Sequence, residues 1–284
     1  MSYPRNAMSF AAKLHEAARL NETWLCVGLD PDPTRLPTRL RDVDDPCSAI
    51  VEFHRSIVAA TRDLVCAYKA NSAFYEALGP IGLETLQQTC AMVPDDIPVV
   101  LDAKRGDVGH TSQKYAEFAF EQMGADAVTL SPYLGVDALA PFLAYGERGV
   151  FLLCRTSNPS SSDLQDLQCG GKPLYQHVAE SALDWQRTSD ATLGLVAGAT
   201  SPEQLGLIRD VVGEATVLLV PGVGAQQGDL GAAVRAGVNR DGRNAIVNAS
   251  RGVLYASDGP DFADAARASA ERLRQGINDQ GGRP

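Results

Sequence analysis

The sequence predicts an α/β protein built as one (β/α)8 TIM barrel, and three observations carry this prediction. Short apolar, β-branched runs recur eight times, and several lack polar alternation, as expected of parallel strands that are covered on both faces. Helical patterns lie between these runs, which indicates a parallel sheet. No GxGxxG follows the first run, and eight strand–helix units in 284 residues fit a closed barrel better than an open sheet.

The expected strands follow one another along the whole chain, which we interpret as a single domain over residues 1–284. A short helical lead-in over about 1–22 precedes the first strand, and a tail over about 274–284 is expected to be frayed. The expected strands are 23–30, 64–71, 97–104, 126–131, 149–155, 192–198, 216–221 and 245–250.

Three of the intervening segments carry clear helix signals. Residues 49–64 place apolar side chains at helical spacing. The segment "SQKYAEFAFEQMGA" reaches Gly124, which is expected to cap the end of a helix. In "SPEQLGLIRDVV", Ser201 is a natural N-cap, Pro202 fits the first helical position, and Gln204 would complete a capping box.

Two connections differ from ordinary turns. Residues 156–173 are polar, rich in Ser and Gly, and too long for a simple βα turn, while residues 222–231 are glycine-rich. Both follow strands, so they lie on the C-terminal face of the expected barrel, where barrels of this class place their active sites.

Composition excludes several classes of partner. The formal net charge is −10 and no basic stripe offsets it, which argues against nucleic acid. No apolar run approaches the roughly 20 residues of a membrane-spanning helix, and the N-terminus lacks an uninterrupted signal-peptide core. We therefore expect no nucleic-acid or membrane partner, and a small-molecule ligand instead.

The cysteines and histidines are widely dispersed. The six cysteines form no CxxC pair, and Cys26, Cys66 and Cys154 lie in apolar runs where a thiol behaves as a small hydrophobe. Reduced thiols and a cytoplasmic location are predicted. The four histidines are equally scattered, so no metal site is expected.

The segment "VVLDAKRGDVGHT" (99–111) ends a strand-like run in alternating charges. Side chains alternate along a strand, so Asp102 and Lys104 are expected on one side, at the mouth of the barrel. Lys69 ends the preceding strand, and Asp107 follows closely, so these four can form one cluster of alternating sign. A structural ion-pair network is the alternative interpretation. The polar ends of several other strands on the same face favour an active site.

Polar residues end other strands on this face. Asp30 follows the first strand and could hydrogen-bond a sugar hydroxyl, although an Asx turn or helix cap would also explain it. Ser157 begins the long fifth loop and could contact a ring carbonyl or amide, and Ser131 is a weaker candidate of the same kind. The loops "VPGVGAQQGD" and "NASRG" could bind a phosphate through backbone N–H groups, Arg251 and Gln226.

Six segments together resemble the orotidine 5′-phosphate decarboxylase family, in the form typical of its longer bacterial branch. "LDAKRGDVGHT" is similar to the family's DxKxxDxxxT signature, with Val108 in place of the expected isoleucine. The other segments occur in family order along nearly the whole chain. They are "CVGLDPDP", "AYKANSAFYEALG", "RTSNP", "VPGVGAQ" and "NASRG".

The resemblance implies a role for each matching residue. Lys104 would protonate C6 of the pyrimidine, Asp102 would lie beside the leaving carboxylate, and Lys69 would bridge charges and sugar hydroxyls. Asp107 and Thr111 would reach the partner subunit's site in a homodimer. The remaining contacts implied are Asp30 with the ribose, Ser157 with the pyrimidine, and Gln226 (or its neighbour Gln227) and Arg251 with the phosphate.

The reaction implied is the conversion of orotidine 5′-monophosphate to UMP and CO2, without cofactor or metal. Three alternatives remain open from the sequence. A related barrel decarboxylates β-keto sugar phosphates with Mg²⁺, although the "RTSN" and "PGVGAQ" matches argue against it. A Schiff-base aldolase would use Lys69 or Lys104 as a nucleophile. A non-catalytic nucleotide-binding barrel would not need the four charged residues.

Overall fold

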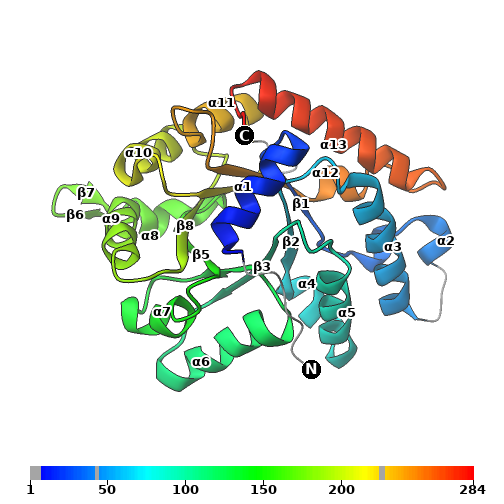
Figure 1. Cartoon of the computed structure of the whole chain (residues 1–284), viewed down its shortest axis with the longest axis horizontal. Coiled ribbons are helices and arrows are strands. Elements are labelled where there is room, and N and C mark those ends of the chain that lie inside the picture. Colours follow the sequence, from blue (N-terminus) through cyan, green and yellow to red (C-terminus); the bar gives the residue numbers. More distant parts are fainter. Residues whose placement is uncertain (1–7, 42–44, 224–227) are drawn as a thin grey trace.

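The computed structural model describes residues 8–41, 45–223 and 228–284 (Figure 1). Within these residues, parallel strands close a barrel in the order β1-β10-β9-β8-β5-β4-β3-β2. All eight predicted strands are confirmed. They are β1 (Leu25–Gly28), β2 (Ala67–Asn71), β3 (Val99–Arg105), β4 (Ala127–Leu130), β5 (Gly149–Arg155), β8 (Thr192–Ala197), β9 (Leu218–Pro221) and β10 (Ala245–Ala249).

Helices surround the barrel and cover the outer faces of its strands (Figure 1). Every helix within the described ranges is too short or too polar to cross a bilayer. In chain order they are α1 (Phe10–Asn21), η1 (Pro33–Arg35), α2 (Thr38–Arg41), α3 (Pro46–Thr61), α4 (Ser72–Glu76), α5 (Pro80–Ala91), α6 (Gly109–Glu117), η2 (Phe118–Gln122), α7 (Val136–Leu143), η3 (Pro159–Ser161), α8 (Ser162–Gln165), α9 (Leu174–Gln186), α10 (Pro202–Val212), α11 (Leu230–Gly237), α12 (Arg251–Leu254) and α13 (Phe262–Asp279).

The lead-in helix α1 packs at the N-terminal end of the barrel. Phe10 is buried there, and its ring meets Phe151 edge-on at 5.7 Å. At Gly149, the first residue of β5, an added Cβ would lie only 2.5 Å from the Phe10 ring, so no larger residue fits. The charged residues end their strands, so they lie at the C-terminal end of the barrel, opposite α1.

Most local helix signals are confirmed, with one exception. Ile50, Phe53, Ile57 and Val58 are buried in α3, which ends at Thr61 rather than at Leu64, and Gly124 has a left-handed φ of 63° after η2. Pro202 begins α10 with Ser201 as N-cap, but the Ser201 side chain accepts no hydrogen bond from the helix. The predicted capping box was therefore wrong. Ser201 has ψ of 68°, short of the extended conformation that aims a cap hydroxyl at the first amides.

The expectation of a frayed tail from residue 274 was also wrong. Helix α13 continues to Asp279, and Ile277 is fully buried. Asn278 Nδ2 donates to the carbonyl oxygen of Glu22 (2.9 Å), and Gly282 N donates to that of Ile277 (3.0 Å). Residues 274–284 contain one large apolar side chain, Ile277, among polar residues and glycines. The amphipathic pattern that predicts a helix is therefore recognised only when the preceding turns of α13 are included.

The long fifth connection contains structure of its own. Between β5 and α9 the chain forms η3, α8 and a small antiparallel pair, β6 (Gln168–Cys169) with β7 (Lys172–Pro173). Arg155, the buried last residue of β5, binds both carboxylate oxygens of Asp166 at 3.0 and 3.1 Å and also contacts the hydroxyl of Ser161. This bidentate pair ties the loop to the strand from which it departs.

His54, on α3, is fully buried, with Nδ1 3.3 Å from Thr89 Oγ1 and 3.4 Å from the Tyr75 hydroxyl. Burial lowers the pKa of His54 to about 3, so the folded protein keeps this imidazole neutral. The unfolded chain has a histidine pKa of about 6.5. Between these two values only the unfolded chain binds the proton, so stability falls as the pH falls.

We expect acidification from about pH 7 to about pH 5 to remove about 2 kcal/mol of unfolding free energy through His54 alone. His54→Asn cannot titrate, so its unfolding free energy should change about 2 kcal/mol less over the same interval, whatever its stability at neutral pH. Denaturant unfolding of both proteins at the two pH values measures this. Equal losses in the two proteins would contradict the prediction.

Candidate active site

The charged residues lie at the C-terminal ends of neighbouring strands. Lys69 is on β2, and Asp102 and Lys104 are on β3, which pairs with β2 in a register that sets Asn71 opposite Asp102. Asp30 follows β1, whose last residue, Gly28, is opposite Lys69. These strands run in parallel, so all four side chains reach the same end of the barrel.

The structure brings Lys69, Asp102 and Lys104 together as predicted. Lys69 Nζ lies 3.0 Å from Asp102 Oδ2, and Lys104 Nζ lies 2.6 Å from Asp102 Oδ1. The side chain of Lys69 is 5% exposed and that of Asp102 11%, whereas that of Lys104 is 45% exposed. Asp102 therefore holds two ammonium groups, one enclosed by the barrel and one open to its mouth.

Asp102 and Lys69, the two buried members of the cluster, remain charged at neutral pH. Burial by itself would raise the pKa of the Asp102 carboxyl, but Lys69 and Lys104 outweigh it and hold this pKa well below its usual range. Burial would likewise lower the pKa of Lys69, but attraction by Asp102 and Asp30 raises it above its ordinary value. The cluster is thus a fixed arrangement of charges.

Lys104 reaches Asp102 in a way that simple strand alternation does not describe. Its φ is 48°, in the left-handed region, and the pairing of β3 with β4 shifts register between Leu101 and Arg105. A β-bulge therefore lies at Lys104, and it re-aims this side chain toward the carboxylate two residues earlier. A left-handed lysine costs roughly 1 kcal/mol or more, and such strain concentrates at functional sites.

Thr129 on β4 supports this bulge, a role that was not predicted from the sequence. Its hydroxyl donates to Asp102 Oδ1 (2.9 Å) and accepts from the backbone N–H of Lys104 (3.0 Å). Thr129 is fully buried, and a buried backbone N–H needs an acceptor. The Thr129 hydroxyl is that acceptor for the Lys104 N–H at the bulge. A threonine inside an otherwise apolar strand run, beside the charged strand, was the available signal.

Replacing Thr129 with valine is expected to lower the free energy of unfolding by about 1–3 kcal/mol. The change preserves shape but leaves the Lys104 amide without this acceptor. Thr129→Ser restores the hydroxyl and should recover most of the loss. Denaturant unfolding of the three proteins tests this. A loss in the serine variant with none in the valine variant would show that the methyl group, not the hydroxyl, matters.

Asp30 joins the cluster directly. Its Oδ1 lies 3.6 Å from Lys69 Nζ and accepts a hydrogen bond from the backbone N–H of Asn71 (3.0 Å). A Cβ on Gly28 would lie 1.8 Å from Ser250 Oγ and 3.2 Å from Asp30 Oδ2, so glycine is required for the ends of β1 and β10 to approach. Lys69 therefore contacts two carboxylates of its own chain, Asp102 and Asp30.

Asp107 and Thr111 lie farther along the same segment. Asp107 precedes α6, and its Oδ1 accepts from the N–H of Val108 (2.8 Å). It is not among the described side chains that contact Lys69 or Lys104, so the predicted interleaved set of four is incomplete in one chain. Thr111 is half-buried in the first turn of α6.

The other predicted contacts lie at the same end of the barrel. Ser157 packs on Gly198 after β8, where an added Cβ would lie 2.8 Å from the Ser157 backbone. Ser131 follows β4, and its N–H donates to the carbonyl oxygen of Arg105 (2.7 Å). Arg251 is exposed at the start of α12, directly after β10. Gln226 and its neighbour lie outside the described residues.

Comparison with known proteins finds relatives that match nearly the whole chain. Residues 23–266 match the sequence profile of a family described as "Orotidine 5'-phosphate decarboxylase / HUMPS family". The orotidine 5′-phosphate decarboxylase of Cellvibrio japonicus is 52% identical over 274 residues, which cover 95% of this chain and 98% of the relative. That of Cupriavidus taiwanensis is 50% identical over 275 residues, with 95% and 98% coverage.

Solved structures show the same likeness. The Leishmania donovani OMP decarboxylase superimposes with a TM-score of 0.83 at 40% identity, covering 96% of this chain and 99% of that one. The Leishmania donovani UMP synthase has a TM-score of 0.86 at 40% identity and covers 97% of this chain but 57% of its own length.

Proposed function

The chain belongs to the orotidine 5′-phosphate decarboxylase / HUMPS family, and from this premise we propose that it is a carboxy-lyase that converts orotidine 5′-monophosphate to UMP and CO2. The observation that carries the proposal is the half-exposed Lys104 ammonium, held 2.6 Å from an ionised Asp102 at the barrel mouth. The whole-chain similarity to named orotidine 5′-phosphate decarboxylases supports it. UMP as the product would place the enzyme in pyrimidine biosynthesis.

The cluster suits the chemistry of this decarboxylation. Loss of CO2 leaves negative charge on a ring carbon that has no adjacent carbonyl to delocalise it. A cation fixed in advance stabilises this charge without the reorganisation that solvent would require. Lys104 is placed to do so and then to donate its proton to C6. Asp102 holds Lys104 in position, and its own charge opposes the substrate carboxylate until CO2 leaves.

Lys69 would act from the enclosed side of the cluster. Its ammonium lies between Asp102 and Asp30, at 3.0 and 3.6 Å. It lies close to both carboxylates and can bridge to a sugar hydroxyl, with Asp30 and Ser157 as further contacts to ribose and pyrimidine. The raised pKa of Lys69 is the opposite of what a Schiff-base lysine needs, which argues against Lys69 as the nucleophile of an aldolase.

We infer that the enzyme is a homodimer in which Asp107 and Thr111 complete the partner's site. Large apolar side chains are exposed on the segments that follow the neighbouring strands β2, β3 and β4, and Asp107 lies on the second of these segments. Such a concentration of apolar surface is typical of a protein interface. These residues are Phe74, Ile81, Leu83, Val108, Tyr133, Leu134 and Val136.

Arg251 is proposed to bind the phosphate, together with Gln226. Arg251→Ala is expected to raise KM for orotidine 5′-monophosphate by about 10- to 150-fold, because a charge-assisted phosphate contact contributes roughly 1.5–3 kcal/mol and its loss leaves the anion less well held. Initial rates over a range of substrate concentrations measure this. Arg240→Ala, which removes an exposed arginine that pairs with Glu214, is the control. An unchanged KM in Arg251→Ala would place the phosphate elsewhere.

A direct assay tests the proposed function. Purified protein is mixed with orotidine 5′-monophosphate in the presence of EDTA, and the loss of absorbance near the orotate band is followed. Turnover that EDTA does not affect supports the decarboxylase without a metal. Turnover abolished by EDTA and restored by Mg²⁺ would favour the Mg²⁺-dependent sugar-phosphate decarboxylase. Binding of UMP without turnover would indicate a nucleotide-binding barrel.

We also propose that the protein works in the cytoplasm with its thiols reduced. Cys26, Cys66 and Cys154 are buried as free thiols, and Cys169 is an exposed free thiol. Free cysteines of this kind persist in a reducing compartment.

A further inference from the structure

Tyr255 lies between two segments that the proposed function assigns to the ribose and to the phosphate of the substrate. It follows α12, the turn that Arg251 begins, and its N–H donates to the carbonyl oxygen of Arg251 (3.2 Å). Its hydroxyl accepts from the N–H of Asp32 (2.6 Å) and donates to the carbonyl oxygen of Asp30 (3.2 Å). One side chain therefore connects the Arg251 turn to the backbone on both sides of Pro31.

The Tyr255 ring is held in place independently of its hydroxyl. It stacks nearly parallel to Phe53, at 5.9 Å between ring centroids, and the guanidinium of Arg35 lies over it at 4.3 Å. Burial raises the pKa of Tyr255 to about 12, so the hydroxyl stays protonated and can donate. Removing the hydroxyl alone would leave the ring contacts intact.

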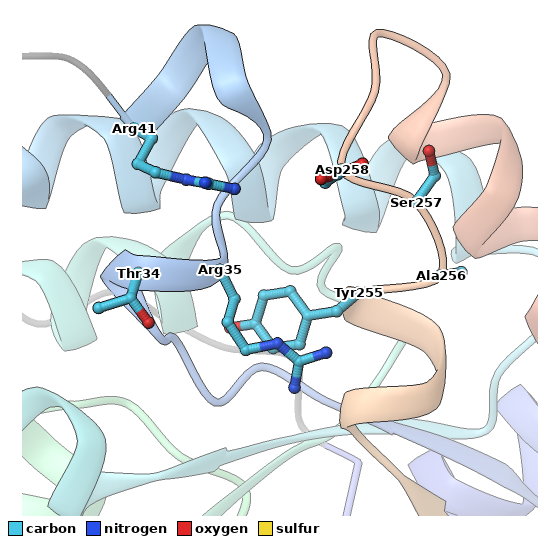
Figure 2. A pocket seen from close by; sticks show the side chains of 7 residues that line it. All are labelled: Thr34, Arg35, Arg41, Tyr255, Ala256, Ser257 and Asp258. Carbon is cyan, nitrogen blue, oxygen red and sulfur yellow. The ribbon is translucent and has the colours of Figure 1, made fainter.

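A cavity of about 410 Å³ lies beside the segment that Tyr255 contacts (Figure 2). Thr34 and Arg35 are therefore not enclosed by packing on this side, and the hydroxyl of Tyr255 contacts the backbone just before them, at Asp30 and Asp32. The cavity is lined by Thr34, Arg35, Arg41, Tyr255, Ala256, Ser257 and Asp258.

Resting on the proposed function, we propose that Tyr255 is a positioning residue for Asp30. By fixing the backbone of Asp30 and Asp32, its hydroxyl keeps the Asp30 carboxylate at 3.6 Å from Lys69 Nζ and at hydrogen-bond distance from Asn71 N. Since Tyr255 also caps the turn that begins with Arg251, it sets the spacing between the ribose contact and the phosphate contact.

Tyr255→Phe tests this assignment, with Tyr145→Phe as a matched control. The Tyr145 hydroxyl makes an equally short hydrogen bond, 2.6 Å to Glu121, but it lies between α7 and η2, away from the cluster. Tyr255→Phe is expected to lower kcat/KM for orotidine 5′-monophosphate about tenfold and to weaken UMP binding by a similar factor, since small displacements of positioning groups are costly. Tyr145→Phe should leave both unchanged.

Two further measurements separate positioning from a merely structural effect. Amide exchange of residues 29–36 in the unliganded protein should speed up in Tyr255→Phe. In an Asp30→Ala background, Tyr255→Phe should cause little additional loss of UMP affinity, because the group it positions is already absent. Full additivity of the two changes, or unchanged UMP affinity in Tyr255→Phe, would overturn the proposal.

These experiments distinguish failure of the Tyr255 proposal from failure of the proposed function. If the wild-type protein does not decarboxylate orotidine 5′-monophosphate, the proposed reaction is wrong, while UMP affinity and amide exchange still decide the role of Tyr255. If the wild type is active and amide exchange changes without any change in kcat/KM or UMP affinity, Tyr255 is structural and the positioning role is wrong.

Discussion

Lys104→Ala is expected to lower kcat for the decarboxylation of orotidine 5′-monophosphate by at least about 10⁴-fold. The change removes both the fixed positive charge beside the reacting carbon and the proton that the product carbanion accepts. Asp102 would then hold Lys69 alone, so the cluster would lose the one ammonium that is open to the barrel mouth. Stopped or sealed assays with long incubation measure the residual rate.

Two controls keep this result specific to the chemistry. UMP should still bind to Lys104→Ala within about a factor of ten, because phosphate and ribose contacts supply most of the affinity. Lys114→Ala removes an exposed lysine on α6 that pairs with Glu117, and it should retain full activity. Wild-type turnover in Lys104→Ala would refute the assignment of the proton donor.

Asp107→Ala is expected to lower kcat/KM by about 10²–10³-fold even though Asp107 contacts no lysine of the described cluster in its own chain. The physical reason is the proposed homodimer, in which this carboxylate reaches the partner's charged site. Mixing provides the decisive measurement. When Lys104→Ala and Asp107→Ala subunits are refolded together in equal amounts, activity should return to roughly a quarter of the wild-type value.

The arithmetic of mixing follows from symmetry. Half of the dimers contain one subunit of each kind, and one of the two sites in such a dimer has both an intact Lys104 and an intact Asp107. Lys104→Ala mixed with Asp102→Ala is the control, because both residues belong to the same chain's cluster and no intact site can form. Absence of recovery in the first mixture, with dimers confirmed by sedimentation, would contradict the shared site.

The strands and the barrel were predictable because their signals are local and repeated. Each apolar run is long enough to identify a strand, and eight runs separated by helical patterns leave few possible arrangements. The errors occurred where the outcome of a short local pattern depended on the tertiary structure around it. Ser201 precedes a helix but does not bond to it, and Ile277 is buried only because α13 continues to pack around it.

The core of the site was predictable for a similar reason. Lys69, Asp102 and Lys104 follow apolar strand runs, and parallel strands bring their C-terminal ends to one edge. Two features could not be predicted. The bulge that places Lys104 in the left-handed region bonds through the Lys104 N–H to the hydroxyl of Thr129, which belongs to another strand. The approach of Asp30 to Lys69 depends on the absence of a side chain at Gly28.

The sequence by itself determined the order of the strands, the end of the barrel that carries the charges, and the residue types able to stabilise a carbanion. Only the tertiary structure decided which carboxylate each ammonium contacts, which lysine is enclosed and which is open, and that Tyr255 joins the Asp30 and Arg251 segments. The physical reason is the separation along the sequence of the residues that decide each feature. Strand identity follows from periodicity over a few residues, whereas charge pairing at distances near 3 Å depends on side chains far apart in sequence, whose relative positions exist only after the barrel closes.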